Sequence, residues 1–126
     1  MSGIVLDSSV VLALLKGERS EVAIPELRWA TMSTVNVAEV LTILAGGDEA
    51  VRRNGLLLLE TLREIAPFTE QHARLAGELQ MQPGVKGLSL GDRACLALAL
   101  SIGAEIYTGD RVWSRLKLPC TIHQIR

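Results

Sequence analysis

The sequence predicts an α/β fold in which a central parallel β-sheet is flanked by α-helices. Short apolar segments rich in β-branched residues alternate with longer apolar segments of helical character, as where residues 3–6 lead into residues 10–15. Residues 94–102 are apolar or small on every side, which is typical of a helix buried on most faces. The 126 residues, 48% of them hydrophobic, are enough for one domain, residues 1–126, with a real core.

Composition narrows the functional classes. No run approaches about 18 apolar residues, so we expect no membrane span, and no basic run precedes an apolar one, so we expect no signal peptide. The two separated cysteines, Cys95 and Cys120, indicate a reduced, cytoplasmic protein. A net charge of −1 argues against bulk attraction to nucleic acid. A polyanion would need a local basic group, and the best candidate follows Asp110: Arg111, Arg115, Lys117 and Arg126.

The first half of the chain reads as strand, helix, helix, strand, helix. The strand at residues 3–6 ends at Asp7, and Ser8 or Ser9 is expected to cap the next helix. The remaining elements expected here are a short helix at 21–28 with Pro25 in its first turn, a brief strand at 31–32, and a helix that Ser33 or Thr34 caps and that ends at Gly46-Gly47.

The rest of the chain, from residue 48 onward, contains further helices and strands. A helix is expected at 48–64, and because its four leucines at 56–59 cannot all face one core, we expect a self-association surface and a homodimer. His72 is expected to be a surface or capping residue, in the first turn of a helix that Thr69 begins. Ser89 caps the buried helix, which ends at Gly103. The other elements expected are strands at 65–68, 104–107 and 121–125, a loop at 82–87 and a helical turn at 111–116.

Four acidic residues stand at unusual places in this pattern. Asp7 and Asp110 each follow a predicted strand. Asp92 lies in the first turn of the buried helix, where the helix dipole favours a carboxylate. Glu39 interrupts an apolar helix and shares its face with Asn36. Strand ends and helix starts lie on one edge of a sheet in an alternating β/α chain, so we expect the four acids to converge.

Converging carboxylates repel one another unless a cation neutralises them. Oxygen ligands without histidine or cysteine favour Mg²⁺ or Mn²⁺ over zinc. One or two such ions activate water and stabilise the leaving oxygen in phosphodiester hydrolysis. The pattern therefore predicts metal-dependent phosphodiester chemistry at Asp7, Glu39, Asp92 and Asp110.

Four motifs carry a family resemblance that covers essentially the whole chain. They are IVLDSS at 4–9, NVAEV at 36–40, LSLGDRACLALA at 88–99 and YTGD at 107–110. Each is weak alone, but all four in this order are specific. In these motifs the chain resembles a PIN-domain ribonuclease, and most closely the VapC-type toxin of VapBC (type II) toxin–antitoxin modules.

The resemblance implies a PIN fold and a Mg²⁺-dependent endoribonuclease that cleaves tRNA or ribosomal RNA and is inhibited by a cognate antitoxin. By motif match it assigns the metal and catalytic roles to Asp7, Glu39, Asp92 and Asp110, and polar supporting roles to Ser9 and Thr108. Proximity in the sequence, not the family, adds Asn36 and Arg93 as contacts to the acids or to substrate phosphate. Arg111 joins them as a substrate-binding residue.

Two other functions remain open at this point. Asp7 after a strand also suits the phosphorylated nucleophile of a phosphatase or phosphotransferase, although Ser9 stands where the haloacid-dehalogenase pattern has a second aspartate. A catalytically inactive PIN-like binding module is the non-enzymatic alternative, and the presence of all four acids argues against it.

Overall fold

The computed structural model describes residues 3–20 and 22–126 and contains a five-stranded, fully parallel sheet. The strand order is β3-β2-β1-β4-β5. The strands are β1 (Ile4–Leu6), β2 (Ala30–Ser33), β3 (Glu64–Ala66), β4 (Glu105–Thr108) and β5 (Ile122–Gln124). The predicted α/β class with a central parallel sheet is confirmed.

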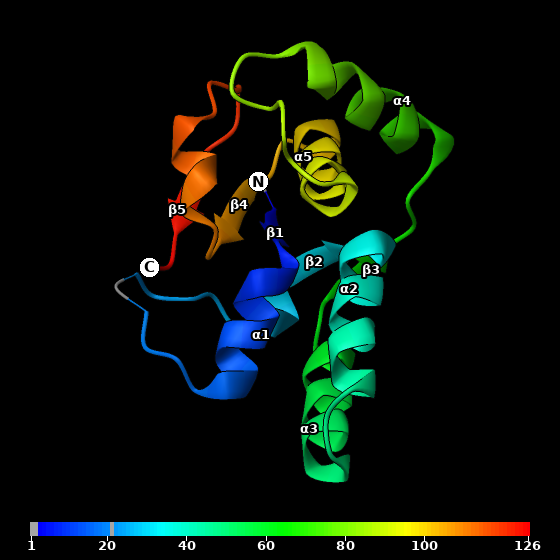
Figure 1. Cartoon of the computed structure of the whole chain (residues 1–126), viewed down its shortest axis with the longest axis vertical. Coiled ribbons are helices and arrows are strands. Elements are labelled where there is room, and N and C mark those ends of the chain that lie inside the picture. The colour runs from blue at the N-terminus through cyan, green and yellow to red at the C-terminus, as the bar shows by residue number, and fades with distance from the viewer. Residues whose placement is uncertain (1–2, 21) are drawn as a thin grey trace.

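Five α-helices connect and cover these strands. They are α1 (Ser8–Lys16), α2 (Thr34–Ala45), α3 (Glu49–Glu60), α4 (Glu70–Glu78) and α5 (Leu90–Ile102). Three short 3₁₀ helices complete the fold: η1 (Leu27–Trp29), η2 (Leu79–Met81) and η3 (Arg111–Arg115). Figure 1 shows α2 and α3 side by side as a hairpin that extends away from the sheet, and α4 lying across α5.

The core forms two layers, one on each face of the sheet. Alternate residues of a strand face opposite sides, so Val5 packs into the layer that contains α5, and Leu6 packs into the layer that contains α1 and α2. The α5 layer includes Leu96, Ile106 and Trp113, all almost fully buried. A parallel sheet needs both faces covered, and these two layers supply that cover.

Three predictions about helix extent and side-chain burial are wrong. No helix forms in the described part of 21–28, namely 22–28 (residue 21 lies outside the described residues), and the only helical structure there is the start of η1. Pro25 lacks an N–H and disfavours a helical conformation at Ile24, which instead packs against the α1 layer. The helix expected at 48–64 ends at Glu60 because Arg63 donates its backbone N–H to Leu27 and Ala30.

The third error concerns His72, which is only 8% exposed although it lies in the first turn of α4. Its Nε2 is 3.1 Å from Oγ of Ser101, so the imidazole lies between α4 and α5. Three other helices begin where they were expected. Ser33, Thr69 and Ser89 each accept a backbone N–H at the start of α2, α4 and α5.

Within the described residues, every helix is too short or too polar to cross a lipid bilayer.

Candidate active site

The buried carboxylate of Asp7 is the centre of the site. Asp7 directly follows β1 and is 3% exposed. The hydroxyl of Ser9 donates to its Oδ2 at 2.6 Å, and the hydroxyl of Thr108 donates to the same oxygen at 3.1 Å. Asp7 itself occupies the N-cap position of α1 without a side-chain cap bond, so the expectation that Ser8 or Ser9 caps this helix is wrong. Ser9 instead holds the carboxylate.

The same two hydroxyls connect Asp7 to the end of β4. Ser9 Oγ accepts the backbone N–H of Gly109 at 2.8 Å, and Thr108 Oγ1 accepts that of Asp110 at 3.1 Å. Asp110 begins η3, where its Oδ1 accepts the N–H of Val112. β1 and β4 are neighbours at the point where the strand order changes direction, which is where open α/β sheets form their ligand crevices.

Asp92 reaches the site from the first turn of α5. The Ser89 hydroxyl accepts the N–H of Asp92, and Oδ2 of Asp92 accepts the N–H of Ser89, both at 3.1 Å. This reciprocal pair is a capping box, and it fixes the turn that carries the carboxylate. Asp92 remains half-buried.

Glu39 comes from α2 and contacts the same turn of α5. Its Oε1 accepts a hydrogen bond of 2.9 Å from Nδ2 of Asn36, which also donates to the carbonyl of Gly91 at 3.0 Å. A Cβ at Gly91 would lie 2.4 Å from Oε2 of Glu39, so the carboxylate rests directly on the glycine backbone. Glu39 thereby contacts the residue that directly precedes Asp92, although 53 positions separate Glu39 from Asp92 in the chain.

The negative charges of neighbouring acids help to raise the pKa of Asp7 and of Asp92. Burial raises the pKa of Asp7, the hydrogen bonds from Ser9 and Thr108 oppose this rise, and the charge of Glu39 adds to it. Burial also raises the pKa of Asp92, the backbone N–H of Ser89 opposes that rise, and the charges of Asp7 and Asp110 add to it. Groups from β1, α2, α5 and the end of β4 therefore form one acidic cluster: Asp7, Glu39, Asp92 and Asp110.

The donor set fits a hard divalent cation. The hydrogen bonds described above fall on one oxygen of each carboxylate: Oδ2 of Asp7, Oε1 of Glu39, Oδ2 of Asp92 and Oδ1 of Asp110. The second oxygen of each carboxylate forms no hydrogen bond with the described residues, and carboxylate oxygens are the ligands that Mg²⁺ and Mn²⁺ prefer. Among residues 3–20 and 22–126, no three His, Cys, Asp or Glu side chains are close enough to hold an ion as they stand. Ion binding thus requires the carboxylates to draw together.

The basic candidates are placed differently from the acids. Nη1 of Arg93 donates to the carbonyl of Ala76 at 2.9 Å, so its side chain is directed to the end of α4 and not into the acidic cluster. Arg111 is exposed at the start of η3, directly after Asp110. Arg126 forms an ion pair with Glu18, and its Cζ is 3.2 Å from the position of a Cβ on Gly109. Arg126 therefore lies beside the end of β4.

Sequence reasoning missed Gly91. The signal was present, because glycine is a poor helix former and stands in the first turn of a helix between Leu90 and Asp92. Such a glycine often marks a close approach by another group, which here is the Glu39 carboxylate.

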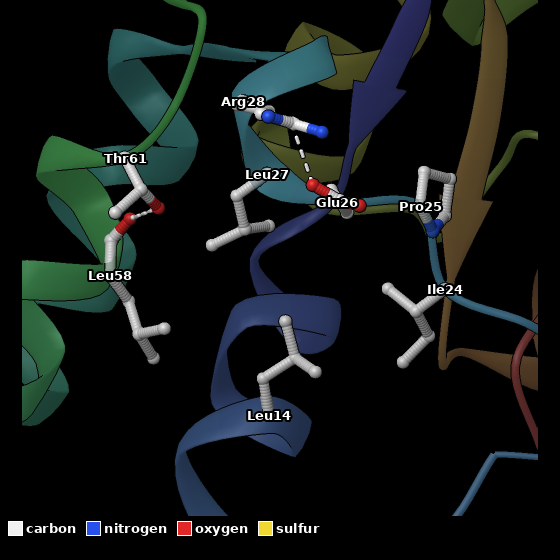
Figure 2. Close-up of a pocket in the computed structure, with 8 residues that line it drawn as sticks. All are labelled: Leu14, Ile24, Pro25, Glu26, Leu27, Arg28, Leu58 and Thr61. Atoms are coloured by element: carbon white, nitrogen blue, oxygen red, sulfur yellow. Dashed lines mark hydrogen bonds and ion pairs between the residues drawn. The ribbon is translucent and has the colours of Figure 1, made fainter.

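A separate apolar pocket of about 500 Å³ lies away from the acidic cluster, between α1, α3 and residues 24–28. Figure 2 shows Leu14, Leu27 and Leu58 projecting into it, with the ion pair between Glu26 and Arg28 at 2.7 Å. None of the four acids lines this pocket.

The chain belongs to the PIN domain family, whose sequence pattern matches residues 4–118. Among curated proteins, no sequence matches significantly. A chain of the VapBC-5 toxin–antitoxin structure from Mycobacterium tuberculosis is 25% identical with a TM-score of 0.70, over 100% of this chain and 99% of that one. A chain of a toxin–antitoxin complex from Klebsiella pneumoniae is 18% identical with a TM-score of 0.76, over 98% of both chains.

A third similar structure, DNA-bound VapBC from Salmonella typhimurium, gives 18% identity and a TM-score of 0.71 over 100% of both chains. The resemblance to VapC-type PIN domains that the sequence predicted is therefore confirmed at the level of family and fold.

Proposed function

We propose that this protein is a Mg²⁺-dependent endoribonuclease toxin that hydrolyses RNA phosphodiester bonds and is inhibited by a cognate antitoxin. The observation that carries the proposal is the convergence of four acids from four chain segments around the carboxyl ends of β1 and β4. The central acid, Asp7, is buried, and neutral hydroxyls donate to it. A buried carboxylate among other carboxylates is costly without a cation, which supports a metal site.

In this proposal Asp7, Glu39, Asp92 and Asp110 hold Mg²⁺ or Mn²⁺. When bound, the ion supplies a Lewis acid for the scissile phosphate and lowers the pKa of a water molecule. Ser9 and Thr108 fix the orientation of Asp7 through Oδ2 and leave Oδ1 to the ion. One carboxylate of the cluster takes the proton of the attacking water. Arg111 is exposed beside Asp110 and is placed to contact a substrate phosphate.

The partners follow from the family. The similar structures from Klebsiella pneumoniae and Mycobacterium tuberculosis are toxin–antitoxin assemblies, which supports an antitoxin partner for this chain. Transfer RNA or ribosomal RNA is the proposed substrate, and these substrates together with two free cysteines favour a cytoplasmic site of action. We also propose a homodimer, because Leu56 and Leu57 are about half exposed on α3.

The proposal is tested with purified protein, free of antitoxin, on total cellular RNA with Mg²⁺ or with EDTA. We expect discrete fragments that require the metal, and a loss of at least about 100-fold in the Asp92→Asn variant. Asp48→Asn is the matched control, because Asp48 is an exposed aspartate that caps α3 outside the acidic cluster. Fragments that persist in EDTA or in folded Asp92→Asn protein would contradict the proposal.

Two further experiments on the same purified protein test the two alternative functions. Formation of a beryllofluoride adduct on the Asp7 carboxylate, which mimics a phosphoaspartate, would support an aspartate-based phosphatase or phosphotransferase. Antitoxin binding without any RNA cleavage would support an inactive PIN-like binding module.

A further inference from the structure

The side-chain amide of Asn36 joins α2 to the first turn of α5 inside the acidic cluster. Asn36 is fully buried, and its Nδ2 donates to Oε1 of Glu39 at 2.9 Å and to the carbonyl of Gly91 at 3.0 Å. Both partners are pure acceptors, so only the NH₂ group of the amide can face them. Both protons of that group therefore form hydrogen bonds, one to Glu39 on α2 and one to Gly91 on α5.

Gly91 completes the arrangement by leaving room for the acid. A Cβ at this position would lie 2.4 Å from Oε2 and 2.5 Å from Oε1 of Glu39, closer than atoms in contact can approach. The Glu39 carboxylate therefore lies on the backbone of α5, one residue from Asp92. The amide of Asn36 donates a hydrogen bond to this carboxylate, and Gly91, which has no side chain, leaves the space that the carboxylate occupies.

Packing alone does not explain an asparagine at this position. Its Oδ1 is buried and accepts no hydrogen bond from the described residues, which is unfavourable for a polar atom. Leucine has a similar shape and would fill the same space without a buried unpaired acceptor. The donors of the amide are therefore the feature that distinguishes Asn36 from an apolar residue here.

We propose that Asn36 is a positioning residue that holds the Glu39 carboxylate against Gly91, one residue before Asp92, in the orientation from which it ligates the divalent cation when the acids draw together. This inference rests on the metal site of the proposed function and deepens it. Asn36 acts only through Glu39 and contacts neither the ion nor the RNA.

The first test uses the metal-free protein and the exchange of side-chain amide protons in ¹⁵N-labelled samples. The chain has two asparagines, and Asn54 is exposed on α3, so it supplies an internal reference. We expect the Asn36 protons to exchange more slowly than those of Asn54. In Glu39→Ala, exchange at Asn36 should become about 10-fold faster, a factor typical of one lost hydrogen bond to a charged group. Unchanged exchange in Glu39→Ala would overturn the proposal.

The second test measures Mn²⁺ affinity by calorimetry in a double-mutant cycle of Asn36→Leu and Glu39→Gln. Asn36→Leu should weaken Mn²⁺ binding about 10-fold in the wild-type background, as expected when a residue that orients a metal ligand is lost. In the Glu39→Gln background the same substitution should change the affinity less than 2-fold. Thr42→Val, which removes a local hydrogen bond on the exposed side of α2, is the control and should leave Mn²⁺ affinity unchanged.

Two variants guard against a failure to fold. If Asn36→Leu does not fold, Gly91→Ala replaces it, because the added Cβ meets the flexible end of Glu39 and displaces the same carboxylate. An equal loss of Mn²⁺ affinity in both backgrounds would overturn the role of Asn36 while leaving the metal site intact. Wild-type protein that binds no Mn²⁺ would overturn the proposed function and this role with it.

Discussion

At the scale of single residues, Asp7 combines burial with a positioned charge. Its carboxylate is almost inaccessible to water, yet two hydroxyl donors hold it in one orientation. Desolvation and the charge of Glu39 both act against its ionised form. The residue is therefore expected to lower the stability of the metal-free fold.

Asp7→Asn should consequently stabilise the metal-free protein, because an amide oxygen still accepts from Ser9 and Thr108 without a charge. We expect the free energy of unfolding to rise by about 1 kcal/mol, the usual scale of a single substitution. Urea unfolding at pH 7 in EDTA measures it. Asp48→Asn, at an exposed cap, should stay within about 0.5 kcal/mol of the wild type.

The advantage of Asp7→Asn should also depend on pH. Burial raises the folded-state pKa of Asp7 above its ordinary 3.8. The stability that its protonated form contributes is then fully present below pH 3.8 and is lost as the pH rises through the raised value. The advantage of Asp7→Asn is thus largest near pH 7 and shrinks toward pH 4. An advantage that grows as the pH falls would contradict this account of Asp7.

Thr108→Val tests the bridge between β1 and β4. The fully buried hydroxyl donates to Asp7 and accepts from the N–H of Asp110, and valine keeps the shape while losing both bonds. We expect a loss of about 1–3 kcal/mol in unfolding free energy, together with weaker RNA cleavage. Thr61→Val is the comparison, since Thr61 forms an exposed local bond to Leu58. Equal losses for the two variants would refute the special role of Thr108.

The sequence predicts a residue well where the position of that residue in a strand or helix determines the environment of its side chain. The four acids were predicted because each stands at a strand end, at a helix start or within an apolar helix. The partners of those acids were harder to predict. Whether Ser9 caps α1 or holds Asp7 depends on Thr108 and Gly109, about 100 positions away, and the contact of Glu39 with Gly91 likewise joins distant segments.

At the scale of elements, helix starts were predictable because capping is local chemistry. Ser33 and Ser89 cap the helices expected of them, and Thr69 caps the helix that it is expected to begin. The exception is α1, which neither Ser8 nor Ser9 caps. Ends were less predictable. α3 ends at Glu60, short of the expected Glu64. The reason is that the backbone N–H of Arg63 donates to the carbonyls of Leu27 and Ala30, which directs the chain toward the sheet. Such contacts are tertiary and leave no local signal.

Ser89→Ala and Thr69→Ala separate capping from function. Each variant removes one side-chain cap, on α5 and α4 respectively, and each should lose about 1 kcal/mol in thermal or urea unfolding. Only Ser89 orders the turn that carries Asp92, so only Ser89→Ala should also reduce RNA cleavage. Equal cleavage by the two variants would show that the capping box does not position Asp92.

At the scale of the whole molecule, the sheet order explains why residues from distant segments meet. Figure 1 shows β1 between β2 and β4. Asp7, which follows β1, therefore has the end of β4 and Asp110 on one side, and the end of β2, where α2 begins, on the other. The class of fold followed from the β/α alternation, but the register and order of the strands did not. We infer that residues 1–126 act as one domain, since both core layers share this sheet.

The exposed leucines of α3 make the homodimer testable. Leu59 is buried while Leu56 and Leu57 are 48% and 54% exposed, so part of the predicted leucine surface faces solvent. Light scattering should give twice the mass of one chain, and Leu57→Glu should shift it toward the monomer. Ile102→Glu alters a similarly exposed residue at the end of α5 and should not. A monomeric wild-type protein would contradict the dimer.

The most direct test of the central claim, one cation site built by four distant acids, is anomalous scattering from crystals soaked with Mn²⁺. We predict a peak at the second carboxylate oxygens of Asp7 and Asp92, with Glu39 and Asp110 around it, which is absent in Asp7→Asn. Oε1 of Glu105 on β4 and Nε2 of His123 on β5 are 3.1 Å apart and lie outside the acidic cluster, so this pair is the reference position. A peak there, or none at the acidic cluster, would contradict the account.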